Sequence, residues 1–334
     1  MLTRRSIAAA AAVTTALACA FAALPAAAQN KEKVTLLLNW YLYSEHAPFF
    51  LGKERGYFDA EGIELEIQEG RGAGVTVQAV AAGSAQFGYA DVATMIKAAA
   101  KGAPVIATGV LLQTSPMAVM GFAEKNIKTP ADIKGKTIVL TPGDSMSQVW
   151  PLMMQKTGLK EGDFKILSGD AQTKMNALIN GQADLTMGYV MDQPVKLLDA
   201  TKKPVTSIRF ADYGVNLVCS GIVVQKDFLK KNPELVKRFM RAATKTMEEA
   251  QKNPEAAIDA MLKAQPKSGV KESLVGGLKQ ATALYAAPGQ AAGKPYRVAA
   301  KTMNDSFQML LEYGGVDKAT AGKAEDYYTN DYLP

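Results

Sequence analysis

The sequence predicts an α/β protein of two domains, each a mostly parallel sheet flanked by helices, with a hinge between them. From Val34 onward, short apolar segments alternate with segments of helical pattern. This order is typical of a parallel sheet with helices on both faces, because a parallel return needs a crossover connection. A second series of the same kind begins after Phe122, and the last third of the chain carries helical patterns alone.

The first series predicts four strands and three helices. Residues 34–38 form an unbroken apolar run, as in a strand buried on both faces, and residues 63–67 alternate apolar with acidic side chains. Short apolar segments at 87–90 and 105–112 complete the strands. Helical patterns cover 47–55, 75–82 and 92–101.

The second series predicts a helix start followed by three strands and two further helices. The sequence Thr129-Pro130-Ala131-Asp132 has the cap, proline and acidic residue that begin a helix. Strands are expected at 137–140, 164–167 and 185–190, and helices at 145–156 and 173–180. The helical patterns of the last third are expected to pack outside the first sheet.

One detail recurs in both series. Gly83 is followed by Gly88-Tyr89 and Asp91, and Gly181 is followed by Gly188-Tyr189 and Asp192. The shared pattern predicts two domains of one architecture, although so brief a match also arises by chance. We assign residues 29–115 and 229–334 to domain 1 and residues 116–228 to domain 2. Crossings near 113–122 and 215–224 would form the hinge.

Residues 1–28 are typical of an export signal. Arg4 and Arg5 precede an alanine-rich apolar run, and Ala26-Ala27-Ala28 resembles a signal-peptidase site. A membrane anchor is the alternative, but the run is short for a bilayer span. We therefore expect a periplasmic protein, exported by the Sec or the twin-arginine route.

Composition excludes several classes of function. The 38 basic residues include Arg4 and Arg5, so the remainder of the chain carries 36 basic and 32 acidic side chains, a net charge of +4. This mild positive charge excludes an arginine-rich nucleic-acid binder and favours small anionic ligands. Cys19 lies in the leader, which leaves Cys219 alone and excludes both an intrachain disulfide and a cysteine-rich metal site. With one histidine, His46, and no nucleophile motif, we expect no catalytic residue, metal or cofactor.

Candidate ligand-binding residues follow the predicted strands, because open α/β sheets bind ligands beyond the carboxyl ends of their strands. After the first strand, residues 39–46 contain three aromatic and four polar side chains, which could bind a ligand; Trp40 with one tyrosine could instead plug the end of the sheet. The turn 141–148 offers hydroxyl and backbone groups, although Asp144 or Ser145 could be an ordinary helix cap. The glycine-rich turn 70–74 could hold an anion or merely form a tight turn. The predicted set is Asn39, Trp40, Tyr41, Tyr43, His46, Tyr89, Asp91, Gly143, Ser145, Tyr189 and Asp192.

Several segments resemble a known family. They are Leu38-Asn39-Trp40, His46-Ala47-Pro48-Phe49-Phe50, the stretch from Gly52 to Phe58, the stretch from Glu61 to Leu65, residues 83–91, and residues 227–234. The sequence is similar to solute-binding proteins of bacterial ABC importers, of the superfamily that includes sulfonate and nitrate binders. Asn39-Trp40 with His46 resembles the narrower branch of thiamine-pyrimidine binders and the related fungal pyrimidine synthases.

The resemblance implies a type II-like periplasmic binding fold whose two domains close on a small molecule, and delivery of that molecule to an inner-membrane permease. The sequence gives no sign of oligomerisation, so we expect a monomer. It implies that Trp40 and the loop tyrosines stack on a ring that Asp91 and Asp192 help to hold. A thiamine-related pyrimidine is the expected ligand, and a sulfonate, nitrate, riboflavin or an aromatic carboxylate is the alternative. Synthase activity, with His46 and a pyridoxal-type cofactor, is not expected, because the fungal cysteine cluster is missing and Cys219 alone remains.

Overall fold

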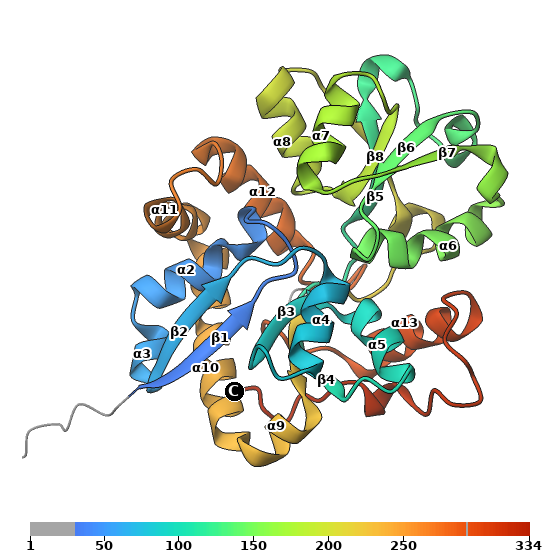
Figure 1. Cartoon of the computed structure of the whole chain (residues 1–334). Coiled ribbons are helices and arrows are strands. Elements are labelled where there is room, and N and C mark those ends of the chain that lie inside the picture. The colour runs from blue at the N-terminus through green and yellow to red at the C-terminus, as the bar shows by residue number, and fades with distance from the viewer. Residues whose placement is uncertain (1–30, 292) are drawn as a thin grey trace, which may run out of the picture.

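The computed structural model describes residues 31–291 and 293–334, so the predicted signal peptide at 1–28 lies outside the described residues. The chain forms two β-sheets, each flanked by helices and each at the centre of its own lobe (Figure 1). We call the lobe that contains β1 the first lobe and the lobe that contains β6 the second lobe.

The first lobe is built on a five-stranded sheet of order β2-β1-β3-β10-β4. Strands β2, β1 and β3 are parallel, whereas β10 is antiparallel to both of its neighbours. The strands are β1 (Glu32–Leu37), β2 (Ile63–Gln68), β3 (Phe87–Asp91), β4 (Val105–Val110) and β10 (Ser220–Gln225). The helices between the early strands are α2 (Ala47–Glu54), α3 (Tyr57–Ala60), α4 (Ala73–Ala81) and α5 (Val92–Ala100).

The second lobe repeats this plan with the order β7-β6-β8-β5-β9, in which β5 is the antiparallel strand. Its strands are β5 (Met117–Phe122), β6 (Thr137–Leu140), β7 (Lys165–Ser168), β8 (Leu185–Tyr189) and β9 (Val205–Arg209). Its helices are α6 (Ser145–Thr157), α7 (Ala171–Ile179) and α8 (Gln193–Thr201).

The predicted fold class is confirmed, because each sheet has four strands in one direction and one in the other. The chain crosses between lobes after β4 and again before β10. The sequence boundary placed residues up to 228 in domain 2, but Ser220–Gln225 pair with β3 and β4 of the first sheet. The second crossing therefore ends before residue 220, since the β10 backbone hydrogen-bonds to the first sheet.

The C-terminal third supplies five helices within the described residues. They are α9 (Lys226–Lys231), α10 (Pro233–Lys252), α11 (Pro254–Ala264), α12 (Lys271–Ala283) and α13 (Ala300–Glu312). Helices α10 and α11 pack against α2 of the first lobe, as the sequence predicts. Across the described part of the chain, no helix combines the length and the apolar character needed to cross a membrane.

Helix α12 contacts both lobes at their junction (Figure 1). Ser273 Oγ on α12 donates a hydrogen bond of 2.5 Å to Asp199 Oδ1 on α8. Beside it, Ser44 Oγ of the first lobe donates to the Met191 carbonyl of the second, at 3.2 Å. A β-carbon on Gly277 would lie 2.5 Å from Ser44 Oγ and 2.8 Å from the Met191 oxygen, so only glycine allows α12 to approach this contact.

The neighbouring glycines of α12 provide a matched test of this junction. Gly277→Ala is expected to lower the free energy of unfolding by about 1–3 kcal/mol, because the added methyl overlaps the contact between the lobes. Gly276→Ala is the control, since a β-carbon there meets no atom within 4 Å, and it should be neutral or stabilise by about 0.4–1 kcal/mol. Urea unfolding of both variants checks this; equal effects would contradict the assigned role of Gly277.

Candidate functional site

A cavity lies between the two lobes. It contains about 350 Å³ of space between atoms, part of it open to solvent. The first lobe contributes Asn39, Trp40, Tyr43 and Ala73, and the second contributes Asp144, Ser145, Met146, Lys174, Gly188, Tyr189, Asp192 and Gln193. The cavity follows the carboxyl ends of β1, β6 and β8, as expected for an α/β sheet.

The loop after β1 is held by backbone hydrogen bonds to the glycine-rich turn after β2. Gly70 N donates to the Trp40 carbonyl at 3.2 Å, and Gly72 N donates to the Asn39 carbonyl at 2.9 Å. A β-carbon on Gly70 would lie 1.8 Å from the Leu38 oxygen, so the turn needs glycine to come this close. This turn therefore positions Asn39 and Trp40 in the cavity wall.

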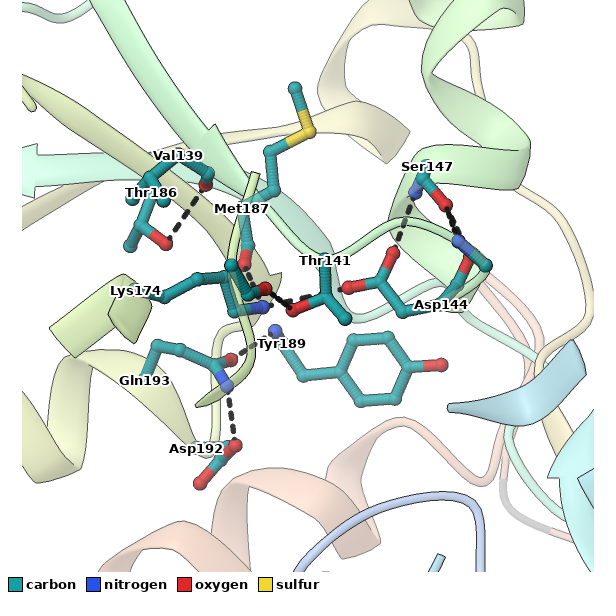
Figure 2. Close-up of polar contacts among 12 residues, drawn as sticks. Val139, Thr141, Asp144, Ser147, Lys174, Thr186, Met187, Tyr189, Asp192 and Gln193 are labelled. Atoms are coloured by element: carbon teal, nitrogen blue, oxygen red, sulfur yellow. Dashed lines mark hydrogen bonds and ion pairs between the residues drawn. The ribbon is translucent and has the colours of Figure 1, made fainter. Parts of the chain in front are cut away.

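Two helix starts position the second-lobe wall. Asp144 caps α6, because its Oδ1 accepts a hydrogen bond of 2.8 Å from Ser147 N (Figure 2). This outcome agrees with the helix-cap alternative that the sequence left open. Lys174 reaches from α7 to the cavity, where its Nζ lies 3.5 Å from Asp144 Oδ2 and 3.1 Å from the Met187 carbonyl. Both side chains are buried, so the two charges compensate each other away from bulk water.

Gln193 organises the wall after β8. Its Oε1 accepts a hydrogen bond of 2.8 Å from Tyr189 N, and its Nε2 donates to Asp192 Oδ2 at 2.6 Å (Figure 2). Asp192 Oδ1 lies 2.8 Å from Lys196 Nζ, in an ion pair one turn apart on α8. The Asp192 carboxylate is thus fixed at the cavity edge with its charge already balanced.

Six of the predicted site residues meet in this cavity, three from the loop after β1 and three from the second lobe. They are Asn39, Trp40, Tyr43, Ser145, Tyr189 and Asp192. The other five lie outside its lining. Tyr41 packs edge-on against Trp40, with ring centroids 5.6 Å apart, and lies under the Arg71 guanidinium.

The remaining four sit behind or beside the cavity. His46 is fully buried and does not line the cavity. Its Nε2 lies 2.8 Å from Oδ1 of Asn39, so it helps to position the cavity-lining Asn39 side chain. Asp91 caps α5 by accepting a hydrogen bond of 2.6 Å from Thr94 N. The Gly143 carbonyl accepts from Gly74 N of the first lobe at 3.3 Å and so joins the lobes beside the cavity. Tyr89 belongs to a buried cluster at the back.

That cluster surrounds Glu45, which the sequence analysis did not select. The hydroxyls of Tyr43 and Tyr89 both donate hydrogen bonds to the Glu45 carboxylate, which is fully buried. Burial raises the pKa of Glu45, and the tyrosine hydrogen bonds oppose that rise. Since Tyr43 also lines the cavity, this buried carboxyl fixes the position of a cavity-lining ring.

Lys174 and Gln193 are the other functional candidates that the sequence did not reveal. Each lies on a second-lobe helix, at residues that carry no glycine-rich or aromatic motif. A lysine on a helix is usually solvent-exposed, but Lys174 has an exposed fraction of 3%. Only the packing of α7 against the cavity distinguishes this lysine from its surface counterparts.

Further contacts hold the lobes together around the cavity. Lys97 Nζ of the first lobe donates to the Gln148 carbonyl of the second at 2.8 Å. Conversely, Lys196 Nζ of the second lobe lies 3.4 Å from the Leu42 carbonyl of the first. Near the back wall, Tyr189 OH is 3.0 Å from Cys219 Sγ. Several polar contacts therefore join the lobes in addition to those of the cavity wall.

Comparisons with known proteins agree with this architecture. A family model described as NMT1/THI5 like matches residues 43–257. A riboflavin-binding protein of Chloroflexus aurantiacus is 28% identical over 262 residues, covering 76% of this chain and 73% of that protein. A 4-amino-5-hydroxymethyl-2-methylpyrimidine phosphate synthase of Legionella pneumophila is 26% identical over 238 residues, covering 71% and 75%. A formylaminopyrimidine-binding protein of Halalkalibacterium halodurans is 24% identical, covering 69% and 70%.

Solved structures share the fold at lower identity. The alkanesulfonate-binding protein of Xanthomonas axonopodis, bound to MOPS, has a TM-score of 0.70 at 14% identity, covering 89% of this chain and 98% of that one. The periplasmic nitrate-binding protein of Synechocystis has a TM-score of 0.67 at 13% identity, covering 90% and 87%. At these identities the likeness establishes the periplasmic binding protein fold and no particular ligand.

The burial of His46 predicts a histidine that does not titrate in its usual range. Burial, reinforced by the Lys196 charge, holds the pKa of His46 well below its ordinary value of 6.5. The unfolded chain takes up this proton below pH 6.5 while the folded chain does not, so stability falls as the pH drops through that region. The loss is at most about 1.4 kcal/mol per pH unit.

Nuclear magnetic resonance of the single imidazole checks this prediction. Its ring-proton shifts should stay constant between about pH 5.5 and 7.5, and His46→Gln should lose less stability over that interval than the wild type. A titration midpoint near pH 6.5 would show that the His46 ring is open to solvent and would contradict its burial.

Proposed function

Since the chain belongs to the NMT1/THI5-like family, we propose that it is an extracytoplasmic solute-binding protein that delivers a small heteroaromatic molecule to an ABC importer. A thiamine-related pyrimidine is the ligand class we favour. In this proposal residues 1–28 direct export to the periplasm, the mature chain is a monomer, and its partner is an inner-membrane permease. The protein carries its ligand without altering it.

The cavity between the lobes is the observation that carries this proposal. Its wall combines the rings of Trp40, Tyr43 and Tyr189 with the polar groups of Asn39 and Asp192. Aromatic planes favour a flat guest, and a few fixed polar groups give it orientation. A site between two lobes suits a carrier, because the lobes can separate to release the guest.

The charges of the cavity favour a neutral or weakly charged guest. Lys174 is balanced by Asp144, and Asp192 is balanced by Lys196. An incoming dianion would meet two carboxylates as well as two ammonium groups, so its desolvation would be poorly compensated. This balance weighs against a phosphorylated ligand.

The names of the relatives support the same class of guest. Two of the relatives described above are named for binding riboflavin and formylaminopyrimidine, both nitrogen heteroaromatics. Riboflavin, an aromatic carboxylate, a sulfonate and nitrate remain the alternative ligands, and a binding experiment separates them.

The synthase alternative receives less support from the site. Several relatives are named as pyrimidine phosphate synthases, but His46 is buried behind Asn39 rather than exposed in the cavity. Cys219, the only cysteine after the predicted leader, is buried against Tyr189. We therefore assign the cavity to binding and test for turnover directly.

A thermal-shift panel tests the proposed function. Pyrimidines, riboflavin, aromatic carboxylates, alkanesulfonates and nitrate are each added to the mature protein, and a thiamine-related pyrimidine should raise the melting temperature most. At a hundredfold excess over Kd the stabilisation is about 2.7 kcal/mol. Mass spectrometry should recover the ligand unchanged, with and without added pyridoxal phosphate. Stabilisation by alkanesulfonates alone, or a converted ligand, would overturn the proposal.

The two tryptophans separate ring stacking from general packing. Trp40→Ala is expected to weaken pyrimidine binding by roughly 1–3 kcal/mol, by analogy with the stacking of bases on aromatic side chains. Trp150 is the control, because it packs against Phe164 and Phe210 away from the cavity. In Trp150→Phe the affinity should persist, and the ligand should quench the remaining Trp40 fluorescence. A Trp40→Ala affinity within about twofold of the wild type would contradict stacking.

A further inference from the structure

Lys174 is a buried ammonium in the wall of the cavity. Its side chain extends from α7 toward Asp144 (Figure 2), and 3% of it is exposed. Removing an ammonium from water costs several kcal/mol unless hydrogen-bond acceptors replace the solvent. The hydrogen-bond acceptors around the Lys174 ammonium therefore indicate which chemical group a ligand of the cavity would carry.

The protein partners of Lys174 leave it incompletely satisfied. An ammonium has three N–H donors, and within the described residues its recorded acceptors are the Met187 carbonyl at 3.1 Å and Asp144 Oδ2 at 3.5 Å. The second distance is long for a charge-assisted hydrogen bond, which usually measures about 2.7–2.9 Å. Asp144 is also committed elsewhere, because Oδ1 caps α6 through Ser147 N.

The third neighbour of the ammonium is an aromatic face. Lys174 Nζ lies over the ring of Trp40, 4.9 Å from the centroid, and this contact joins the two lobes. The ring attracts the cation electrostatically but offers no lone pair in the manner of a carbonyl. An oxygen that entered the cavity beside Trp40 would complete a set of acceptors whose other two members are oxygens.

We propose that Lys174 is a specificity-determining residue, which donates a hydrogen bond to a carbonyl or carboxylate oxygen carried on the ring of the ligand. This inference rests on the proposed function and narrows its ligand class to heteroaromatic molecules with such an oxygen beside the ring. Because Asp144 already balances the lysine charge, a neutral amide or a single carboxylate is preferred over a dianion.

A matched pair of pyrimidines tests the inference by calorimetry. The probes are 4-amino-2-methylpyrimidine-5-carboxamide and 4-amino-2,5-dimethylpyrimidine, which differ in the proposed acceptor. The wild type should prefer the carboxamide by about tenfold or more, as expected for a hydrogen bond to a charged donor. Lys174→Met should reduce this preference to within about twofold. Equal binding of both probes by the wild type would overturn the inference and leave the proposed function standing, whereas binding of neither would overturn both.

Two further variants separate recognition from structural effects. Lys174→Met leaves Asp144 as an unpaired buried charge, so the double variant Lys174→Met/Asp144→Asn removes both charges while Asn preserves the helix cap. If Lys174 served only to neutralise Asp144, this double variant would regain the preference; the inference requires that it does not. Lys97→Met is the control, because Lys97 also donates to a main-chain carbonyl, that of Gln148, but does not line the cavity. The Lys97→Met variant should retain the full preference for the carboxamide. Loss of the preference in this variant would overturn the assignment to Lys174.

Discussion

The site depends on the close approach of three backbone segments. The turn after β2 bonds to the loop after β1 through the Asn39 and Trp40 carbonyls, and two residues later Gly74 N reaches the Gly143 carbonyl of the other lobe. The first two bonds fix the backbone that carries the Trp40 ring and the Asn39 amide in the first-lobe wall. The third bond holds the second-lobe wall beside them. Side chains larger than glycine at Gly70 or Gly74 would push these segments apart. The geometry of the cavity therefore depends on main-chain contacts as well as on its side chains.

Charge compensation is the second organising feature. The two aspartates of the second-lobe wall, Asp144 and Asp192, are each paired with a lysine, and Glu45 at the back accepts hydrogen bonds from two tyrosine hydroxyls. Such an interior exerts little net attraction on a charged solute. Any discrimination among small molecules in this cavity would then depend on the direction of hydrogen bonds and the fit of flat surfaces.

The sequence predicted the fold well because its signals are local. The unbroken apolar run of β1 and the alternating pattern of β2 identify strands wherever they lie, and the Asn39–Trp40 loop was correctly expected at a strand end. The membership of β10 was not predictable, because Ser220–Gln225 has an apolar pattern that would suit either sheet. Burial of His46 and recruitment of Lys174 were missed for a related reason: only tertiary packing distinguishes an interior polar side chain from an exposed one.

The position of β10 also constrains how the molecule can assemble. This strand separates β3 from β4, yet it follows them by more than a hundred residues, after the whole second sheet. In the nascent chain, the edges of β3 and β4 that pair with β10 therefore remain unpaired until β10 has been made. Proteins rich in such remote pairings fold slowly, and here the first sheet can be completed only after all the residues of the second sheet have been synthesised.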